Sequence, residues 1–303
     1  MTPAVMTAKI ADGQGFIAAL DQSGGSTPKA LKGYGIEESA WSTEEEMFGL
    51  IHDMRARIIT SPVFTGDKVI GAILFERTMD GEAGGKPVPQ ALHERGVVPF
   101  LKIDKGLEAE ENGVQLMKAM PGLDALLERA AKLGIFGTKE RSVINLANRE
   151  GIAQVVAQQF DIAQQVLSHG LVPIIEPEVN IKSPERAEAD SILLEELTKA
   201  LDAMTGEAQV MLKLSLPATR DLFRQLVDHP RVLRVVALSG GYARPEACEE
   251  LAQNHGVIAS FSRALLNDLR HEMSDDEFNA SLGAAIDEIW SASAKKAAAS
   301  AAA

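Results

Sequence analysis

Cysteine is nearly absent from this 303-residue sequence, in which Cys248 is the only one. A single cysteine excludes an intrachain disulfide, so a reducing compartment fits and cytoplasmic localisation is predicted. The sequence also has no apolar run of the roughly 18 residues that a membrane-spanning helix needs. Its N-terminus lacks the basic-then-apolar pattern of a signal peptide. We therefore expect a soluble protein with no membrane partner.

Positive charge is also in deficit, with 30 Lys and Arg against 43 Asp and Glu and a net charge of -13. Such an acidic chain is not expected to bind nucleic acid or anionic membranes through non-specific charge. The six histidines are scattered, without H-x-H or H-E-x-x-H spacing. The sequence therefore predicts no metal site and no metal cofactor.

What the sequence does contain is a regular alternation of short apolar runs with helical segments. There are eight such runs: Phe16–Asp21, Gly71–Glu76, Val97–Asp104, Phe136–Arg141, Leu171–Glu178, Val210–Leu216, Val232–Ser239 and Val257–Arg263. Alternation of this kind is typical of repeated βα units around a parallel sheet. Most runs begin apolar and end polar, which gathers charged side chains at the carboxyl ends of the strands.

The helix signals between these runs are explicit. Thr27-Pro28, Ser42 with Glu45, Ser183-Pro184 and Ser274 with Glu277 each predict a helix N-terminus. Pro121–Leu133 carries leucines at helical spacing.

Fold class follows from these signals. No linker divides the chain, so we expect one domain over residues 1–293 with extra helices at 28–60, and a low-complexity Ala-rich tail at 294–303 that is frayed or disordered. An open doubly wound sheet is the alternative, but polar strand ends come from both halves of the chain and no G-x-G-x-x-G follows the first strand. The prediction is an α/β fold, a (β/α)₈ TIM barrel.

Lys213 lies in the middle of the sixth apolar run. At a period of two, Val210, Leu212, Leu214 and Leu216 share one face of the strand, and Lys213 shares the other with Met211 and Ser215. A charge inside such a strand must be paired, or the amine gives up its proton and becomes a nucleophile towards carbonyls. The alternative is an edge strand with a salt-bridged or snorkelling lysine.

Two further lysines, Lys102 and Lys139, end or lie within separate strands. If all three share a pocket, mutual repulsion and burial lower the pKa of at least one amine, as a Schiff-base nucleophile requires. Alternatively, Lys102 and Lys139 simply pair with Asp104 and Glu140.

Carboxylates lie at the same strand ends. Glu176 and Glu178, two residues apart, share one strand face, and paired carboxylates near ammonium groups can supply one acid and one base for imine chemistry. A purely compensating role beside buried lysines is the alternative. Asp21 is either a strand-end base or a helix cap.

Small polar loops suggest anion binding. Ser239-Gly240-Gly241 follows the seventh run and Ser260-Phe261-Ser262-Arg263 ends the eighth, the usual position of a barrel phosphate site, although Ser-Gly-Gly alone is often just a turn. Gln22–Ser26 is either a tight turn or a second substrate loop. Arg141 beside Lys139 predicts a further anion site, so a substrate with two phosphates is expected.

These residues are recognisable together. The stretches are ALDQS at 19–23, GAILFE at 71–76, FLKIDKG at 100–106, GTKER at 137–141, VPIIEPE at 172–178, MLKL at 211–214, LSGG at 238–241 and SFSRAL at 260–265. Over nearly its whole length except the tail, the chain resembles class I fructose-1,6-bisphosphate aldolases, most closely the shorter bacterial form.

The resemblance implies a metal-independent lyase with no cofactor other than a covalent imine on Lys213. The implied catalytic residues are Lys213, Glu178, Glu176, Asp21 and Lys139. The implied phosphate-binding residues are Ser239, Gly240, Gly241, Ser260 and Arg263 on the C1 side, and Lys102, Arg141, Ser23 and Ser26 on the other. The implied partner is a small-molecule sugar bisphosphate in glycolysis and gluconeogenesis, with a homo-oligomer common in the family.

Two features depart from the animal enzymes of this family. Glu140 stands where they have an aromatic residue, and the only tyrosines are Tyr34 and Tyr242, so the C-terminal tyrosine segment is missing. Two other functions remain as alternatives. One is a transaldolase-like transferase of a three-carbon unit, which would prefer donors without a C1 phosphate. The other is a non-catalytic barrel that acts as a binding protein.

Overall fold

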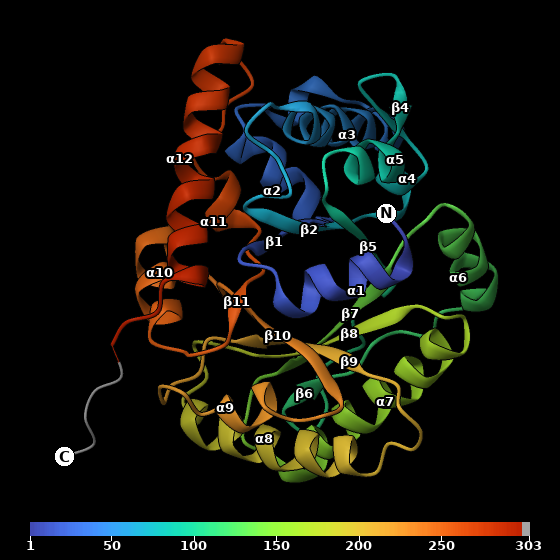
Figure 1. The fold of residues 1–303 in the computed structure, drawn as a ribbon, viewed down its shortest axis with the longest axis vertical. Coiled ribbons are helices and arrows are strands. Elements are labelled where there is room, and N and C mark those ends of the chain that lie inside the picture. Colours follow the sequence, from blue (N-terminus) through green and yellow to red (C-terminus); the bar gives the residue numbers. More distant parts are fainter. Residues whose placement is uncertain (299–303) are drawn as a thin grey trace.

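A computed structural model describes residues 1–298, and eight parallel strands form a nearly closed barrel in it (Figure 1). Their spatial order is β1 (Phe16–Leu20), β2 (Val69–Leu74), β5 (Val98–Lys102), β7 (Gly137–Ile144), β8 (Val172–Val179), β9 (Val210–Ser215), β10 (Val232–Leu238) and β11 (Ile258–Ala259). Each predicted run overlaps one of these strands, although β2 begins two residues before its run and β7 and β8 end three residues and one residue after theirs. The (β/α)₈ barrel is confirmed.

Shorter strands decorate this barrel. β3 (Glu82–Ala83) and β4 (Lys86–Pro87) form a small antiparallel pair, and β6 (Val114–Gln115) pairs antiparallel with β7.

Strand residues alternate between the barrel interior and the surrounding helices. Ile17, Phe100, Ile174, Met211 and Val236 pack together inside the barrel. Their neighbours in sequence belong to the larger outer core between strands and helices. The predicted face of β9 is therefore correct, since Met211 points inward while Val210, Leu212 and Leu214 point outward.

The helices surround the barrel (Figure 1). They are α2 (Ser26–Gly33), α3 (Glu44–Thr60), α4 (Glu76–Met79), α5 (Val88–Glu94), α6 (Leu123–Lys132), α7 (Arg149–Ser168), α8 (Arg186–Asp202), α9 (Arg224–Val227), α10 (Arg244–Ala252), α11 (Arg263–Leu266) and α12 (Asp275–Ala294). A further helix, α1 (Pro3–Asp12), places Met6 and Ile10 in the interior cluster and so covers the amino-terminal end of the barrel. None of the helices within residues 1–298 is long and apolar enough to cross a membrane.

Three predicted helix starts are corrected. The capping box of α3 is Thr43 with Glu46 rather than Ser42 with Glu45, because the Thr43 hydroxyl accepts the Glu46 N–H. α2 begins at Ser26, which puts Thr27 inside the helix, and α8 begins at Arg186, after Ser183-Pro184. The capping box of Ser274 and Glu277 is confirmed.

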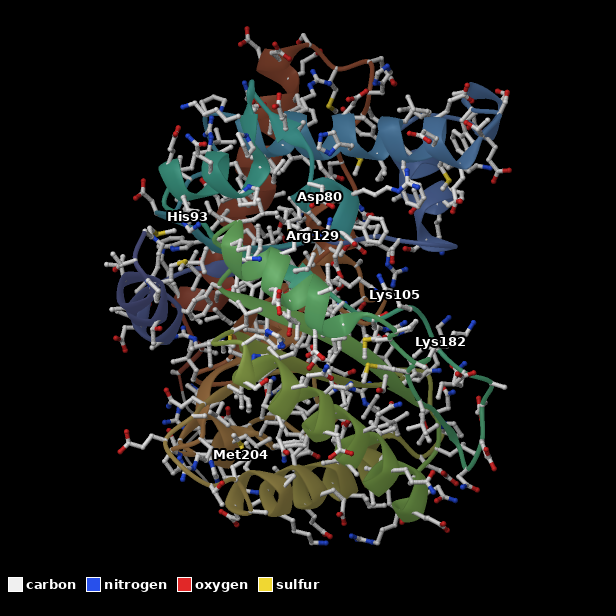
Figure 2. The ribbon with its side chains drawn as sticks, turned by 90° about the vertical axis from the view of Figure 1, so that its right-hand side faces the viewer. Asp80, His93, Lys105, Arg129, Lys182 and Met204 are labelled. Atoms are coloured by element: carbon white, nitrogen blue, oxygen red, sulfur yellow. The ribbon has the colours of Figure 1, made fainter. Side chains whose placement is uncertain are left out.

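Glu76 was predicted to end a strand at the site, and it does not. β2 stops at Leu74, and Glu76 opens α4 on the outside of the barrel. Its carboxylate pairs with Arg129 of α6 and with Lys105, at 2.9 Å from the lysine amine. Figure 2 shows Arg129 and Asp80 side by side on this outer surface. The physical reason is parity, because Glu76 is two residues after the outward-facing Leu74.

The chain beyond α12 is fixed as far as it is described. The Lys296 amine donates to the backbone oxygens of Leu251 and Ala292, and the Ala297 N–H donates to the Ala252 oxygen. The remainder of the predicted Ala-rich tail, residues 299–303, lies outside the described residues.

Candidate active site

A cavity of about 650 Å³ opens at the carboxyl ends of the strands. It brings together nearly all the side chains predicted for the site: Asp21, Ser23, Ser26, Lys102, Lys139, Arg141, Glu176, Glu178, Lys213, Ser239, Gly240, Ser260 and Arg263. Gly241 is the one predicted position that does not line it, although a Cβ there would lie 3.5 Å from the Arg263 guanidinium.

The barrel geometry explains this convergence. On the inward face of a strand, the residues nearer the amino-terminal end are apolar and the next inward residue, two positions later, is polar. On β9 Met211 is followed by Lys213, and on β8 Ile174 is followed by Glu176. The polar side chains of different strands therefore meet in one layer above the apolar interior, at the end where barrel active sites lie.

Four of these side chains form a continuous chain of ion pairs. The Lys213 amine lies 3.1 Å from Glu176 Oε1, and the Lys139 amine lies 2.7 Å from Glu176 Oε2 and 2.8 Å from Asp21 Oδ2. All four are buried; Lys213 is only 4% exposed. Glu176 thus bridges the two amines, one through each of its carboxylate oxygens.

Burial and neighbouring charges shift the pKa values of Asp21 and Lys139 in opposite directions. Burial alone would raise the pKa of Asp21, but Lys139, Lys213 and Lys102 lower it well below its usual range. Burial would lower the pKa of Lys139, but Asp21, Glu176 and Asp104 raise it overall. Asp21 is therefore an ionised carboxylate, and Lys139 remains a permanent cation between two acids.

Two further pairs line the wall of the cavity. The Lys102 amine pairs with Asp104, whose other oxygen accepts the Arg141 backbone N–H at 3.3 Å. Arg141 in turn pairs with Glu178 through its side chain. Burial lowers the pKa of Lys102 despite Asp104, so one of the three lysines is depressed as expected. The alternative pairing is correct for Lys102 with Asp104 and wrong for Lys139, which has Asp21 and Glu176.

Glu140 faces away from the cavity. It has the same parity as Thr138 and Ser142 on β7. The Thr138 hydroxyl donates to the Glu140 carboxylate, and the Ser142 hydroxyl contacts Gln159 of α7. The Gln159 amide donates to the Glu140 backbone oxygen and to the Ser142 hydroxyl, while Glu140 Oε1 and Gln159 Oε1 are buried without a partner. A proton on Glu140 would remove the unpaired charge from this buried carboxyl group. Burial, with Asp104 second, raises the pKa of Glu140 well above its ordinary value.

Glu140→Gln is therefore expected to stabilise the protein increasingly as the pH rises. Folded Glu140 keeps a proton that the unfolded chain loses above about 4.5, so wild-type stability falls with pH until the folded pKa is reached. The gap between variant and wild type should grow by about 1.4 kcal/mol per pH unit over that window. Urea unfolding between pH 5 and 8 measures it. If the free energies of unfolding of variant and wild type differed by the same amount at every pH, a protonated Glu140 would be refuted. Glu188→Gln, at an exposed position of α8, is the control.

The two loops predicted to bind the C1 phosphate, which follow β10 and β11, lie together on one side of the cavity. Ser239 and Ser260 are buried, and the Ser260 hydroxyl has no hydrogen-bond partner among the described residues. Gly240 has a φ of +60°, and a Cβ there would lie 2.6 Å from Ile181, so only glycine fits. Arg263 lies in the same wall, and no carboxylate within residues 1–298 reaches it at ion-pair distance.

Sequence reasoning missed several side chains that line the cavity, namely Lys29, Tyr34, Asn267 and, as a wall residue, Asp104. Lys29 follows Ser26 by three residues, which places both on one face of α2 and was a usable signal. The Tyr34 hydroxyl accepts a hydrogen bond from Arg57 at 3.2 Å. No group of three or more His, Cys, Asp or Glu side chains in the described part of the chain is arranged to hold a metal ion.

Comparison with known proteins gives the family of this chain. The sequence profile of the family described as fructose-bisphosphate aldolase class-I matches residues 4–216, which include Asp21, Lys139, Glu176 and Lys213. Arg263 and the loops after β10 and β11 lie beyond the matched range.

A solved structure shares the fold. The fructose-bisphosphate aldolase of Plasmodium falciparum, solved with TRAP and a small-molecule inhibitor, is 21% identical, with a TM-score of 0.77 over 97% of this chain and 95% of its own. A putative orotidine-monophosphate decarboxylase from Toxoplasma gondii is more distant, at 13% identity and a TM-score of 0.44 over 95% of both chains. The family profile matches most of this chain, and the barrel resembles that of a solved aldolase. This chain therefore belongs to the class-I fructose-bisphosphate aldolase family, whose members are Schiff-base lyases.

Proposed function

We propose that this protein reversibly cleaves fructose 1,6-bisphosphate into dihydroxyacetone phosphate and glyceraldehyde 3-phosphate through an imine on Lys213, without a metal ion. The observation that carries the proposal is the Lys213–Glu176–Lys139–Asp21 chain at the floor of the cavity. It supplies a nucleophilic amine, an acid–base group in contact with it, and an ionised carboxylate further along.

The first half of the reaction forms the imine. Lys213 in its neutral form attacks the C2 carbonyl of the open-chain sugar, and the resulting carbinolamine loses its hydroxyl as water. Glu176, at 3.1 Å from the amine, is placed to protonate that hydroxyl. Glu178, two residues further along the same face of β8 and paired with Arg141, is the second carboxylate available for proton transfer.

The second half breaks the C3–C4 bond. Asp21 accepts the proton of the C4 hydroxyl, the C4–O bond becomes the aldehyde carbonyl, and the electrons of C3–C4 move into the iminium to give an enamine. Lys139 holds Asp21 ionised for this role. Protonation at C3 and hydrolysis then release dihydroxyacetone phosphate and restore the amine.

Uncompensated positive charge in the cavity supports a proposed position for each phosphate. Lys102 and Arg141 are paired with carboxylates, whereas Arg263 and Lys29 have no carboxylate at ion-pair distance among residues 1–298. A phosphate needs uncompensated charge and hydrogen-bond donors, and the wall with Ser239, Gly240, Ser260 and Arg263 provides both. We assign the C1 phosphate there. We assign the other phosphate to the side of Ser23, Ser26, Lys102 and Arg141, where Lys29 supplies the uncompensated charge.

Substrate comparison in excess EDTA tests the proposal. Cleavage of fructose 1,6-bisphosphate should be faster than that of fructose 6-phosphate, which has no C1 phosphate. A preference for fructose 6-phosphate, with transfer of its three-carbon unit to an aldose phosphate, would instead support a transaldolase-like enzyme. Loss of cleavage in EDTA would contradict the metal-free mechanism.

Arg263→Ala is expected to raise KM for fructose 1,6-bisphosphate by about ten- to a hundredfold, because a charge-assisted hydrogen bond to phosphate is lost. The change in kcat should be smaller, since Arg263 does not reach the reacting carbons in this assignment. Steady-state kinetics measure both. Arg224→Ala, which removes an exposed arginine paired with Asp228, should leave KM unchanged. An unaltered KM in Arg263→Ala would move the phosphate elsewhere.

A further inference from the structure

The barrel has one weak seam, between β1 and β11. Every other pair of neighbouring strands is joined by a ladder. The ladders range from eight residue pairs between β7 and β8 to two pairs between β8 and β9 and between β10 and β11. No ladder joins β1 to β11 in the described residues. A backbone hydrogen bond from the Ala19 N–H to the Phe261 oxygen, at 3.1 Å, crosses this seam.

Side chains cross the same seam. The Gln22 amide nitrogen donates to the Ser262 hydroxyl at 2.6 Å and to the Ala19 oxygen at 3.3 Å. Gln22 follows β1 directly after Asp21, and Ser262 follows β11 directly before Arg263. The link therefore joins the two loops that carry the proposed C4 base and the proposed phosphate ligand.

A buried arginine, Arg55, fixes the position of Gln22 in this link. Arg55 of α3 is 1% exposed and donates to both the Gln22 backbone oxygen and its side-chain oxygen, the latter at 3.2 Å. Its other terminal nitrogen donates to the buried Thr78 hydroxyl at 2.8 Å, which anchors it to α4. With both oxygens engaged by Arg55, the Gln22 amide has one orientation, and its nitrogen must face Ser262.

Asp21 supplies the charge that Arg55 needs. The hydrogen-bond partners of Arg55 are all neutral, so its cation is compensated only at longer range. Burial lowers the pKa of Arg55 to about 10, and the field of Asp21 opposes that shift. The guanidinium thus remains charged at neutral pH. Neither Arg55 nor Thr78 lines the cavity.

We propose that Arg55, Gln22 and Ser262 form a side-chain clasp that closes the β1–β11 seam and sets the position of Arg263 relative to Asp21. These three are positioning residues, and the proposal rests on the proposed function for the role of the phosphate wall. A substrate held by its phosphate at Arg263 and attacked at Lys213 must present its C4 hydroxyl to Asp21. A seam that opens by a fraction of an ångström would misplace one end of the substrate against the other.

Two readouts on Arg55→Met and Ser262→Ala test the clasp. Hydrogen exchange should become about tenfold faster at the amides of residues 19–22 and 260–266, because local opening of the seam becomes easier. The Kd for inorganic phosphate, measured by calorimetry, should increase by about tenfold. Because both substitutions break the same link, the double variant should be no worse than the more severe single variant. If Arg55→Met does not fold, Thr78→Val replaces it in the cycle.

Ser61→Ala is the matched control. Ser61 is also buried and donates its hydroxyl proton across a long sequence distance, to Asn279 at 2.6 Å, but away from the cavity. The Ser61→Ala variant should be less stable than the wild type, but its hydrogen exchange at the β1–β11 seam and its affinity for phosphate should not change. Unchanged exchange at the seam in Arg55→Met, or additive effects in the double variant, would overturn the clasp. A wild-type protein that shows no phosphate binding would contradict the proposed function instead, and the exchange readout would still decide on the clasp.

Discussion

Replacing Lys213 with methionine is expected to abolish carbon–carbon bond cleavage while the barrel stays folded. Methionine keeps an unbranched stem on the inward face of β9 and removes the amine that forms the imine. Loss of a covalent nucleophile typically costs at least about 10⁴-fold in rate. The assay is cleavage of fructose 1,6-bisphosphate, with circular dichroism and thermal unfolding to verify the fold.

The stability of this variant should change little. Glu176 loses one amine but keeps the Lys139 amine at 2.7 Å, so the carboxylate is still compensated. Lys105→Met, on the outside of the barrel beside Glu76, controls for the loss of any lysine and should retain full activity. Turnover in Lys213→Met above a hundredth of the wild-type rate would be incompatible with imine catalysis at this position.

Lys139→Met is expected to damage both stability and activity. Lys139 contacts two buried carboxylates, Asp21 at 2.8 Å and Glu176 at 2.7 Å, and its removal leaves Asp21 without its nearest cation. Breaking a buried ion pair in this way costs about 3–5 kcal/mol. Asp21 should then hold a proton at neutral pH and fail as a base, which lowers the cleavage rate by at least about a hundredfold.

The stability deficit of Lys139→Met should grow with pH. In the wild type the Asp21 pKa is held below 3.8, so this group adds stability that is present above 3.8 and is lost as the pH falls towards the folded value. In the variant, burial is no longer opposed by Lys139, the folded pKa rises, and stability falls as the pH rises. Urea unfolding at pH 4 and pH 7 should show the larger deficit at pH 7. An equal deficit at both values would mean that Lys139 acts by packing rather than by charge.

The barrel could be predicted because parallel strands leave strong local signals. Seven of the eight barrel strands have five to eight residues and β11 has two. Most of them are apolar, and the inward face of a strand follows from a period of two. Lys213 and Glu176 were placed correctly because they share the parity of Met211 and Ile174. Glu76, two residues beyond β2, and Glu140, in the middle of β7, show the limit of using sequence position alone, since both have outward parity.

Helix starts were less accurate, because several residue types compete for a cap within two or three positions. Thr43 caps α3 although Ser42 offered a similar side chain, and the choice depends on backbone angles that tertiary packing sets. The pairing of Lys139 was also beyond sequence reasoning. Its partners are Asp21, directly after β1, and Glu176 of β8. The nearest acid in sequence, Glu140, is on the opposite face of its own strand.

The clasp is the clearest case of information absent from local sequence. Gln22 and Ser262 are 240 residues apart, and Arg55 lies in the middle of a helix whose other buried residues are mostly apolar. No spacing rule connects them, because the contact exists only once the first and last strands of the barrel meet.

Borohydride trapping in excess EDTA tests the central claim most directly. The wild-type protein is incubated with dihydroxyacetone phosphate, reduced with borohydride and digested, and the modified peptide is identified by mass spectrometry. We expect a single reduced three-carbon phosphate adduct on Lys213, with cleavage activity that survives the chelator. No adduct, an adduct on Lys102 or Lys139 instead, or activity lost to EDTA would contradict imine catalysis at Lys213.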